Sequence, residues 1–276
     1  MQINKLNITL SKYLCFILIS SNIWMAQVNV PGDYETIQDG IDAASEGDTV
    51  LVAPGTYTGE GNIDLYFYGA SITVMSANGP ASTIIDCDTD GDGVGDERGI
   101  TFDEGESSMS FFDGFTIING DQSDGGGILI EESSPTIQNC IITSCTAGDG
   151  GGIYIDYSSA TLINVIVSNN VSDDNAGGIY ITESDGVVLS DVTISNNESG
   201  YKGGGMYLDT SSPTMDNLTI SGNVASNSGG GISLDASSPI MTNVTISGNT
   251  CADLGAGMDV SDESYPTLDN VTISGN

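Results

Sequence analysis

A unit of about 26 residues recurs along the second half of the chain, and it limits the possible folds more than any other feature. In each copy, one to three glycines precede an aliphatic anchor residue. The anchors are Ile128, Ile153, Ile179, Met206, Ile232 and Met258, spaced 25 to 27 residues apart. A repeat of this length cannot bury a hydrophobic face alone, so the units must stack on one another.

Each copy predicts short β-strands. Triplets such as Ile-Tyr-Ile and Val-Thr-Ile alternate between apolar and polar residues and are bounded by Gly, Pro and Asn. A second block reads Asn-Leu/Val-Thr-Ile-Ser-Gly-Asn over 217–223, 243–249 and 270–276. A third hydrophobic position recurs at Ile137, Leu162, Leu189, Met215, Met241 and Leu268. Stacked strands would pair with the turns above and below at roughly 4.8 Å. The sequence therefore predicts an all-β fold, a single-stranded parallel β-helix with rungs of about 26 residues from about 113 to 276.

A leucine-rich repeat is the competing interpretation, because Met215, Leu218, Ile220 and Asn223 fit its consensus and its period overlaps. That fold needs a helix or a compact turn after the asparagine. Here residues 224–231 read Val-Ala-Ser-Asn-Ser-Gly-Gly-Gly and lead into another strand. We therefore favour the β-helix.

An asparagine column ends the second block. Its members are Asn170, Asn197, Asn223, Asn249 and Asn276, and Cys145 occupies the same column. An inward asparagine at a tight corner tolerates unusual dihedral angles and bonds to neighbouring backbone groups. Asn-x-Thr is also a glycosylation pattern, but the repeat already explains these residues. Cys145 and Cys251 fall about four rungs apart, too far for a disulfide with its limit of ~7 Å between Cα atoms. We predict that no disulfide framework holds the fold.

The first 26 residues form a separate segment. They contain no acid, carry Lys5 and Lys12, and run apolar from Tyr13 to Ile19. This pattern is typical of a secretory signal peptide, with cleavage after Ala26, and is too short for a permanent membrane span. We predict bacterial export to the medium or cell surface, no transmembrane segment, and a β-helix domain over 27–276.

The charge excludes several classes of function. The chain has 38 Asp and Glu, 4 Lys and Arg and no His, for a net charge of −34. A surface this acidic repels phosphate, so nucleic acid is excluded as a partner. The lack of His excludes His-dependent catalysis and His-ligated metals.

The insertion over 86–97 resembles a calcium-binding loop. The matching positions are Asp88, Asp90, Asp92 and Gly93 at loop positions 1, 3, 5 and 6, and Asp96 at position 9. Position 12 is Gly99, where a bidentate Glu is expected. We predict a weak Ca²⁺ site of the extracellular kind with Asp88, Asp90, Asp92 and Asp96 as ligands; a solvated acidic turn is the alternative.

The repeat register also predicts two columns on one outer face. Acids follow the anchors at Glu131, Asp156, Asp209 and Asp235, with Thr182 and Ser261 interrupting them. Beside them Tyr154, Tyr180 and Tyr207 fall on consecutive rungs and predict a flat aromatic strip. The acids are either a solvated edge or part of a cation or glycan groove. The tyrosines are either cross-strand packing or a platform for sugar rings. The candidate ligand-binding residues are Tyr154, Tyr180, Tyr207, Asp156, Asp209 and Asp235.

The N-terminal part carries a family resemblance. Residues 30–45 read Val-Pro-Gly-Asp-Tyr-Glu-Thr-Ile-Gln-Asp-Gly-Ile-Asp-Ala-Ala-Ser, and 47–57 read Gly-Asp-Thr-Val-Leu-Val-Ala-Pro-Gly-Thr-Tyr. This resembles the start of right-handed parallel β-helix proteins of the pectin-lyase-like superfamily. The later repeats resemble bacterial surface β-helix proteins of the polymorphic outer-membrane type. The resemblance implies a short capping helix, here about 35–45, which its apolar spacing also predicts.

The resemblance implies two classes of function. Enzymes of this fold use acid-bound calcium with an Arg or Lys base, or clustered Asp with His, Arg and Lys. Beyond the signal, this chain keeps only Arg98 and Lys202, about four rungs apart. We therefore predict an exported scaffold, adhesin-like, that binds a polysaccharide or cell-surface glycan. The alternative is a calcium-assisted polysaccharide lyase or glycoside hydrolase. The sequence stops at Asn276 in mid-repeat, so we expect further turns, a cap or active residues beyond it.

Overall fold

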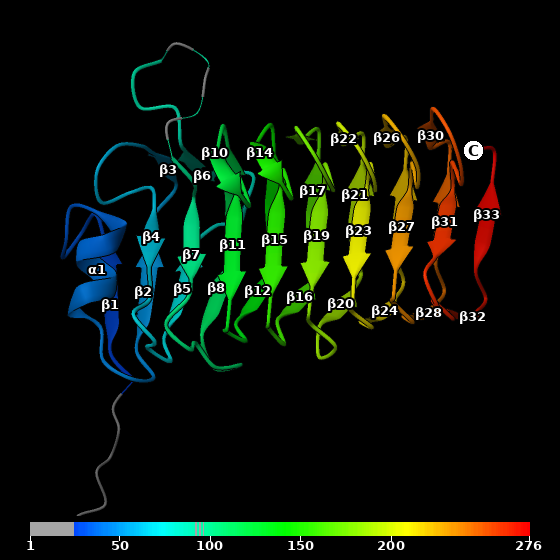
Figure 1. The fold of residues 1–276 in the computed structure, drawn as a ribbon. Helices are drawn as coiled ribbons and strands as arrows, with labels where there is room; N and C mark the ends of the chain where they lie inside the picture. The colour runs from blue at the N-terminus through cyan, green and yellow to red at the C-terminus, as the bar shows by residue number, and fades with distance from the viewer. Residues whose placement is uncertain (1–24, 92, 94, 96) are drawn as a thin grey trace, which may run out of the picture.

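The computed structural model describes residues 25–91, 93, 95 and 97–276, and the predicted signal peptide falls almost entirely outside them. The chain winds into one solenoid whose strands form four parallel sheets, named A to D (Figure 1).

Sheet A has ten strands: β1 (Gln27–Val30), β2 (Thr49–Val52), β5 (Thr73–Ser76), β8 (Phe111–Asp113), β12 (Thr136–Gln138), β16 (Thr161–Ile163), β20 (Val188–Ser190), β24 (Thr214–Asp216), β28 (Ile240–Thr242) and β32 (Thr267–Asp269). Sheet B has nine: β3 (Gly55–Tyr57), β6 (Thr83–Asp86), β9 (Thr116–Ile118), β13 (Ile141–Thr143), β17 (Ile166–Ser168), β21 (Thr193–Ser195), β25 (Thr219–Ser221), β29 (Thr245–Ser247) and β33 (Thr272–Ser274).

Sheet C has eight strands: β4 (Leu65–Tyr66), β7 (Ile100–Phe102), β11 (Ile128–Glu131), β15 (Ile153–Asp156), β19 (Ile179–Thr182), β23 (Met206–Asp209), β27 (Ile232–Asp235) and β31 (Met258–Ser261). Sheet D has six: β10 (Asp121–Asp124), β14 (Thr146–Asp149), β18 (Val171–Ser172), β22 (Glu198–Ser199), β26 (Val224–Ala225) and β30 (Thr250–Cys251). In the regular part, one turn passes through sheets A, B, D and C in that order.

The register confirms the stacking that the repeat predicts. The anchor Ile153 of β15 pairs with Ile179 of β19, which pairs with Met206 of β23. All these pairs are parallel, and the hydrophobic anchors point into a continuous core; those from Ile128 to Ile232 are fully buried, and Met258 on the last turn is partly buried. The parallel β-helix is confirmed, and the leucine-rich repeat is wrong because no helix lines the described repeats.

The structure has more strands per turn than the sequence reveals. The third hydrophobic position, as at Ile137, belongs to a strand of its own in sheet A. Sheet D, such as β14 with the sequence Thr-Ala-Gly-Asp, has no apolar alternation and was not predicted. Its small polar residues form strands because the turns before and after them already stack in register.

Buried asparagines form a hydrogen-bonded ladder, as the Asn column predicts. In Asn197, Asn223 and Asn249, Oδ1 accepts from the backbone N–H and the side-chain Nδ2 of the asparagine one turn earlier. The Nδ2 group also donates to a backbone carbonyl, for example from Asn223 to Ile194 O at 3.1 Å. Cys145 begins the column and its N–H donates to Asn170 Oδ1 at 2.9 Å.

A second ladder, of serines, was not predicted. Its members are Ser133, Ser158, Ser184, Ser211, Ser237 and Ser264, all buried. Each hydroxyl from Ser158 to Ser264 accepts from the N–H of the serine one turn earlier, at 2.9 to 3.1 Å, and the Ser133 hydroxyl accepts from the Gly105 N–H. The ladder ends at the buried carboxylate of Glu106, which accepts from Ser133 Oγ at 2.8 Å. These serines, three of which begin a Ser-Ser-Pro step, therefore satisfy the buried N–H groups of one corner of the solenoid.

The described cysteines are free thiols, in agreement with the predicted lack of disulfides. Cys140 and Cys145 are each 1% exposed. Burial raises the pKa of both thiols to about 12. They therefore stay protonated and act as small hydrophobic side chains.

One short helix covers the N-terminal end. Helix α1 (Ile37–Ala43) is shorter than the predicted 35–45, because Thr36 caps it and Ala44 is extended. Thr36 Oγ1 accepts from the N–H of Asp39 at 3.1 Å. Ile37 and Ile41 are buried against the first turn. Within the part of the chain that the structure describes, no helix has the length and hydrophobicity of a membrane span.

Candidate functional site

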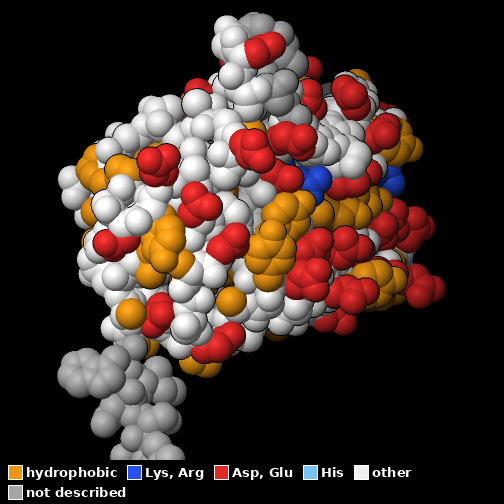
Figure 2. Space-filling model, turned by 90° about the vertical axis from the view of Figure 1, so that its left-hand side faces the viewer, with side chains coloured by type: hydrophobic (Ala, Val, Ile, Leu, Met, Phe, Trp, Pro, Cys, Tyr) orange, Lys and Arg blue, Asp and Glu red, His pale blue; other side chains and the backbone are white. Residues whose placement is uncertain are grey.

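The predicted tyrosine and acid columns lie together on the outer face of sheet C. Tyr154 pairs with Tyr180, and Tyr180 with Tyr207, on three consecutive turns. The acid column runs beside them in the same register, from Glu131 and Asp156 to Asp209 and Asp235. We call the surface formed by Glu131, Tyr154, Asp156, Tyr180, Tyr207, Asp209 and Asp235 the tyrosine–acid face. Figure 2 shows acidic and hydrophobic side chains gathered on one side of the solenoid, with Lys and Arg side chains among them.

The tyrosines do not form the flat strip that the sequence predicts. The rings of Tyr154 and Tyr180 meet edge to face, with centroids 5.0 Å apart and an interplanar angle of 83°. Tyr180 and Tyr207 are also 5.0 Å apart and tilted by 35°. Ala176, in the turn from sheet D to sheet C, packs against this cluster, and Tyr180 and Tyr207 are only 8% and 6% exposed. Tyr154 alone keeps a partly open ring.

The hydroxyls and carboxylates are coupled across turns. Tyr180 Oη donates to Asp209 Oδ2 at 3.5 Å, and Tyr207 Oη donates to Asp235 Oδ2 at 3.2 Å. Burial, followed by the neighbouring carboxylates, raises the pKa of all three tyrosines above its ordinary value. The phenols therefore remain protonated donors, and they orient the acids that receive their hydrogen bonds.

Lys202 closes one end of the tyrosine–acid face. Its Nζ lies 3.6 Å from Asp235 Oδ2 and 5.7 Å from the ring centroids of both Tyr201 and Tyr207. A cation over two ring faces beside a carboxylate is held in place by both kinds of contact. Lys202 is therefore already engaged by this chain's own residues.

Arg98 lies at the other end of the same sheet. It is 9% exposed, and its Nη1 donates to Thr101 Oγ1 at 3.4 Å. Burial lowers the pKa of the guanidinium, while Asp64, Asp124 and the adjoining Glu97 raise it. The register places β7, which follows Arg98, four turns before β23, which follows Lys202. The predicted separation of the two residues is therefore confirmed.

Sequence reasoning missed a second row of acids and an exposed tyrosine. Asp124 and Asp149 pair in sheet D, and both act electrostatically on Tyr154. Tyr157, which follows Asp156, is 62% exposed. Tyr157 directly follows the last residue of β15, so the repeat register could have placed it at the end of that strand. Asp149 could not have been placed in this way, because it belongs to a sheet that the sequence does not reveal.

The surroundings of Asp149 raise the pKa of its carboxyl group. Burial raises its pKa, while the backbone and the side chain of Asn175 lower it; the Asn175 N–H donates to Asp149 Oδ1 at 2.8 Å. The carboxylates of Asp124 and Asp174 raise it further. Asp149 is therefore an acid with a raised pKa that also acts electrostatically on the partly open Tyr154.

We expect this protein to become more stable on mild acidification. Burial is the first cause of a raised pKa at Asp103, Asp121, Asp149 and Asp156. A carboxyl whose pKa is higher in the folded than in the unfolded chain takes up protons on folding, so its contribution to stability grows as the pH falls. Circular dichroism should show Tm rising as the pH is lowered from 7 towards the ordinary Asp pKa of about 4. Asp149→Asn should flatten that rise, and a Tm that decreases over this range contradicts the expectation.

The calcium-like loop lies apart from the tyrosine–acid face. Asp88 accepts from Gly91 N at 2.7 Å and from Gly93 N at 2.9 Å, which shapes the turn. Asp90 also belongs to the described part, whereas Asp92 and Asp96 lie outside the described residues. Among the described side chains alone, no three acids or cysteines converge on a possible metal position.

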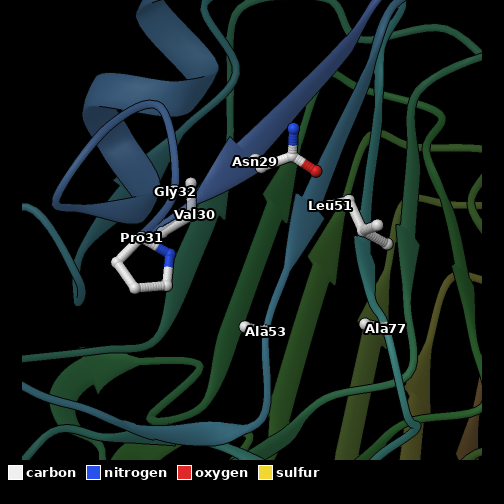
Figure 3. A pocket seen from close by; sticks show the side chains of 7 residues that line it. All are labelled: Asn29, Val30, Pro31, Gly32, Leu51, Ala53 and Ala77. Carbon is white, nitrogen blue, oxygen red and sulfur yellow. The ribbon is translucent and has the colours of Figure 1, made fainter.

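Two hollows flank the N-terminal turns. One has a volume of about 550 Å³ beside the acidic loop and is lined by Glu60, Gly61, Ile63, Asp64, Thr89 and Glu97. The other, of about 330 Å³, is mostly apolar and is lined by Asn29, Val30, Pro31, Gly32, Leu51, Ala53 and Ala77 on the outer side of sheet A (Figure 3). Neither contains a residue of the tyrosine–acid face.

Comparison with known proteins concerns the fold. A family model described as the right handed beta helix region matches residues 55–184 and 126–276. Pectate lyase Pel9A superposes with a TM-score of 0.58 and 16% identity, covering 90% of this chain and 77% of the lyase. ORF18 of Geobacillus virus E2 gives a TM-score of 0.49 and 14% identity over 91% of this chain and 62% of that protein. The A-module of the Azotobacter vinelandii mannuronan C-5 epimerase AlgE4 gives 0.38 and 16%, over 91% and 96%. None of the curated proteins compared with the chain matches it.

Proposed function

Because the chain belongs to the family with a right handed beta helix region, whose right-handed solenoid it shares with pectate lyase Pel9A, we propose that it is an exported protein that binds a glycan on the tyrosine–acid face. The observation that carries this proposal is the tyrosine column on consecutive turns, bordered by carboxylates in the same register. Export rests on the composition of residues 1–26, and a pectate lyase of the same fold supports a carbohydrate as ligand.

The chemistry of the face favours an uncharged glycan. Carboxylates only accept hydrogen bonds, and sugar hydroxyls donate them. Tyr154 is partly open, and Tyr157 beside it is exposed, so a sugar ring has aromatic surface to pack on at this point. An acidic glycan would be repelled by the carboxylates of Asp156 and Glu131, and Lys202 is bound to Asp235.

Binding should be lost when the open tyrosine is removed. We expect Tyr154→Ala to weaken binding to a neutral oligosaccharide by about tenfold or more, because a buried aromatic anchor is worth more than about 1 kcal/mol. A glycan array identifies the ligand, and isothermal titration calorimetry measures its Kd. The control is Tyr34→Ala, since Tyr34 is exposed but lies before α1, away from sheet C. Equal affinities for Tyr154→Ala and the unmodified protein would remove the face from the function.

Hydrolysis of a bound glycan is the second candidate. Asp149 and Asp156 both have raised pKa values, and both act electrostatically on Tyr154. Such a pair suits general acid–base catalysis. A lyase reaction has less support, because Arg98 is buried and Lys202 is engaged with Asp235. Incubation with a polysaccharide panel separates the candidates: new reducing ends without unsaturated products indicate a hydrolase, and intact polymer indicates a binding protein.

Calcium belongs to the proposal as a stabiliser of the loop over 86–97, with Asp88, Asp90, Asp92 and Asp96 as ligands. Binding of the extracellular type has Kd values of about 10⁻⁴ to 10⁻³ M. We expect 10 mM Ca²⁺, roughly ten times the weaker value or more, to raise Tm by a few degrees, because a ligand stabilises the state that binds it.

The loop variant Asp88→Asn should lose this calcium-dependent rise. Asp174→Asn serves as its control, because Asp174 is an exposed acid in the turn before β19. A Tm that Ca²⁺ leaves unchanged, or one that shifts equally in Asp88→Asn, would show that the loop is only a solvated acidic turn.

A further inference from the structure

The most regular motif of the sequence, Thr-Ile-Ser, lies outside the tyrosine–acid face. It forms the outer side of the last four strands of sheet B, namely β21, β25, β29 and β33. We name this surface the threonine–serine face; it consists of Thr193, Ser195, Thr219, Ser221, Thr245, Ser247, Thr272 and Ser274. We propose that it binds the surface of ice crystals, an activity separate from the proposed glycan binding.

The face is a regular two-column grid. Thr193 pairs with Thr219, Thr219 with Thr245, and Thr245 with Thr272, and the serines pair in the same register. Neighbouring turns are roughly 4.8 Å apart, and the two residues on one strand are separated by about 6.6 Å along it. Figure 1 shows successive turns stacked side by side along the solenoid, and the register of the threonines and serines continues from β21 to β33 without interruption. Hydroxyl and methyl groups are therefore presented at fixed intervals.

The core does not require these residue types. The central isoleucines, such as Ile194, Ile220 and Ile246, point inward and are fully buried. Threonine suits a strand, but serine is not among the residues that strands favour. Thr219 and Thr245 are exposed, and Ser221 and Ser247 are partly exposed. Small hydroxyl residues therefore occupy outward positions of a kind that carry acids in the other sheets.

The lack of charge on the outer side of sheet B indicates an uncharged partner. From β9 to β33, none of the 14 outward positions of sheet B carries an ionisable side chain, in a chain with 38 acids. The outer faces of the other sheets include acids, for example Asp216 in sheet A, Asp156 in sheet C and Asp121 in sheet D. The row next to the threonines has one acid, Asp191. An uncharged face on so acidic a protein is complementary to an uncharged partner.

The residue types at these positions restrict the chemical class of the partner further. The 14 outward positions include no aromatic ring, so the face lacks the stacking surface that sugar rings use. Each hydroxyl both donates and accepts hydrogen bonds. The matching partner is planar, neutral and periodic, and its own atoms also donate and accept. The surface of ice has all four properties.

The test is ice recrystallisation in the presence of the purified protein. We expect the unmodified protein to keep ice crystals small at micromolar concentration and to partition into slowly grown ice. Thr219→Glu combined with Thr245→Glu should raise the required concentration at least tenfold. Thr214→Glu is the matched control, because Thr214 is an exposed threonine on the outer side of sheet A. It should leave the activity unchanged.

A second double variant distinguishes a loss of ice binding from a loss of folding. Thr219→Val with Thr245→Val preserves side-chain shape and strand preference but removes two hydroxyls, and circular dichroism verifies that both pairs of variants stay folded. The proposal is overturned if the unmodified protein leaves crystal growth unaffected, or if Thr214→Glu is as damaging as the double variant. It is also overturned if sedimentation shows a dimer that Thr219→Glu with Thr245→Glu dissociates, since the face would then bind a second copy, or if crystalline cellulose captures the protein and ice does not.

Discussion

Replacing Asn223 by alanine should destabilise the solenoid by roughly 3 to 5 kcal/mol. The side chain makes four hydrogen bonds: Oδ1 accepts from the backbone N–H and Nδ2 of Asn197, and Nδ2 donates to Ile194 O and Asn249 Oδ1. Asn223 is fully buried. Its removal leaves the buried Asn197 N–H without its partner, at a cost of about 1–3 kcal/mol. It also removes one hydrogen bond each from the Ile194 carbonyl, Asn249 Oδ1 and Asn197 Nδ2, and each is worth about 1 kcal/mol. Urea denaturation followed by circular dichroism measures the loss.

Asn217→Gly is the control for this ladder. Asn217 lies six residues earlier, is exposed, and donates from its side chain to Asp191. Its φ is +58°, a conformation that glycine adopts without strain. We expect a change below about 1 kcal/mol, as for most surface substitutions. Comparable losses in the two variants would show that the buried ladder is not what holds the corner of each turn.

Gly204→Ala should have an effect of similar or greater size. A methyl group at this position would lie 2.4 Å from the carbonyl oxygen of Val224 and 2.5 Å from that of Gly230. Both contacts are with the backbone of the following turn, which cannot move without breaking the ladder between turns. Overpacking of this kind costs typically 1–3 kcal/mol and more where the backbone is rigid. We expect a loss of about 3 kcal/mol or more, measured by thermal and urea denaturation, and a low yield of folded protein.

A second glycine separates close packing from backbone strain. Gly248 has a φ of +65°, and a methyl group there would meet nothing closer than Gly222 N at 3.9 Å. Gly248→Ala should therefore cost only the strain of a left-handed residue, about 1–2 kcal/mol. If Gly204→Ala is as mild as Gly248→Ala, the turns are packed less closely than the structure indicates.

These contacts explain why glycines precede the anchor residue in every turn. The Gly-Gly pairs before the anchors are needed because the backbones of consecutive turns approach too closely for a side chain, as at Gly204 and Gly178. The buried column of Asn170 to Asn249 was predicted as a structural device, and it is one. The capping helix, the lack of a disulfide framework and the parallel register were also predicted, because each follows from a residue pattern that is local or repeated.

The candidate site was predictable only in part. The period places Tyr154, Tyr180 and Tyr207 in one column, since one residue per turn at a constant spacing must align. It does not reveal how far they are buried, because that depends on Ala176 and its turn, which the structure folds against the rings. It also does not reveal Asp149, because sheet D has no hydrophobic alternation.

The solenoid, the residues that share each column and the charge of the surface could all be predicted from the amino-acid sequence. Those properties follow from the spacing of side chains along one repeating chain, and each turn repeats the same contacts with its neighbours. Tertiary structure alone decided which columns are open and which are covered, that Lys202 is bound to Asp235, and that two rows of acids flank Tyr154. Exposure and electrostatic coupling depend on the angles at which the corners of each turn fold. These angles are set by packing between the sheets, and the repeat period of the sequence contains no information about that packing.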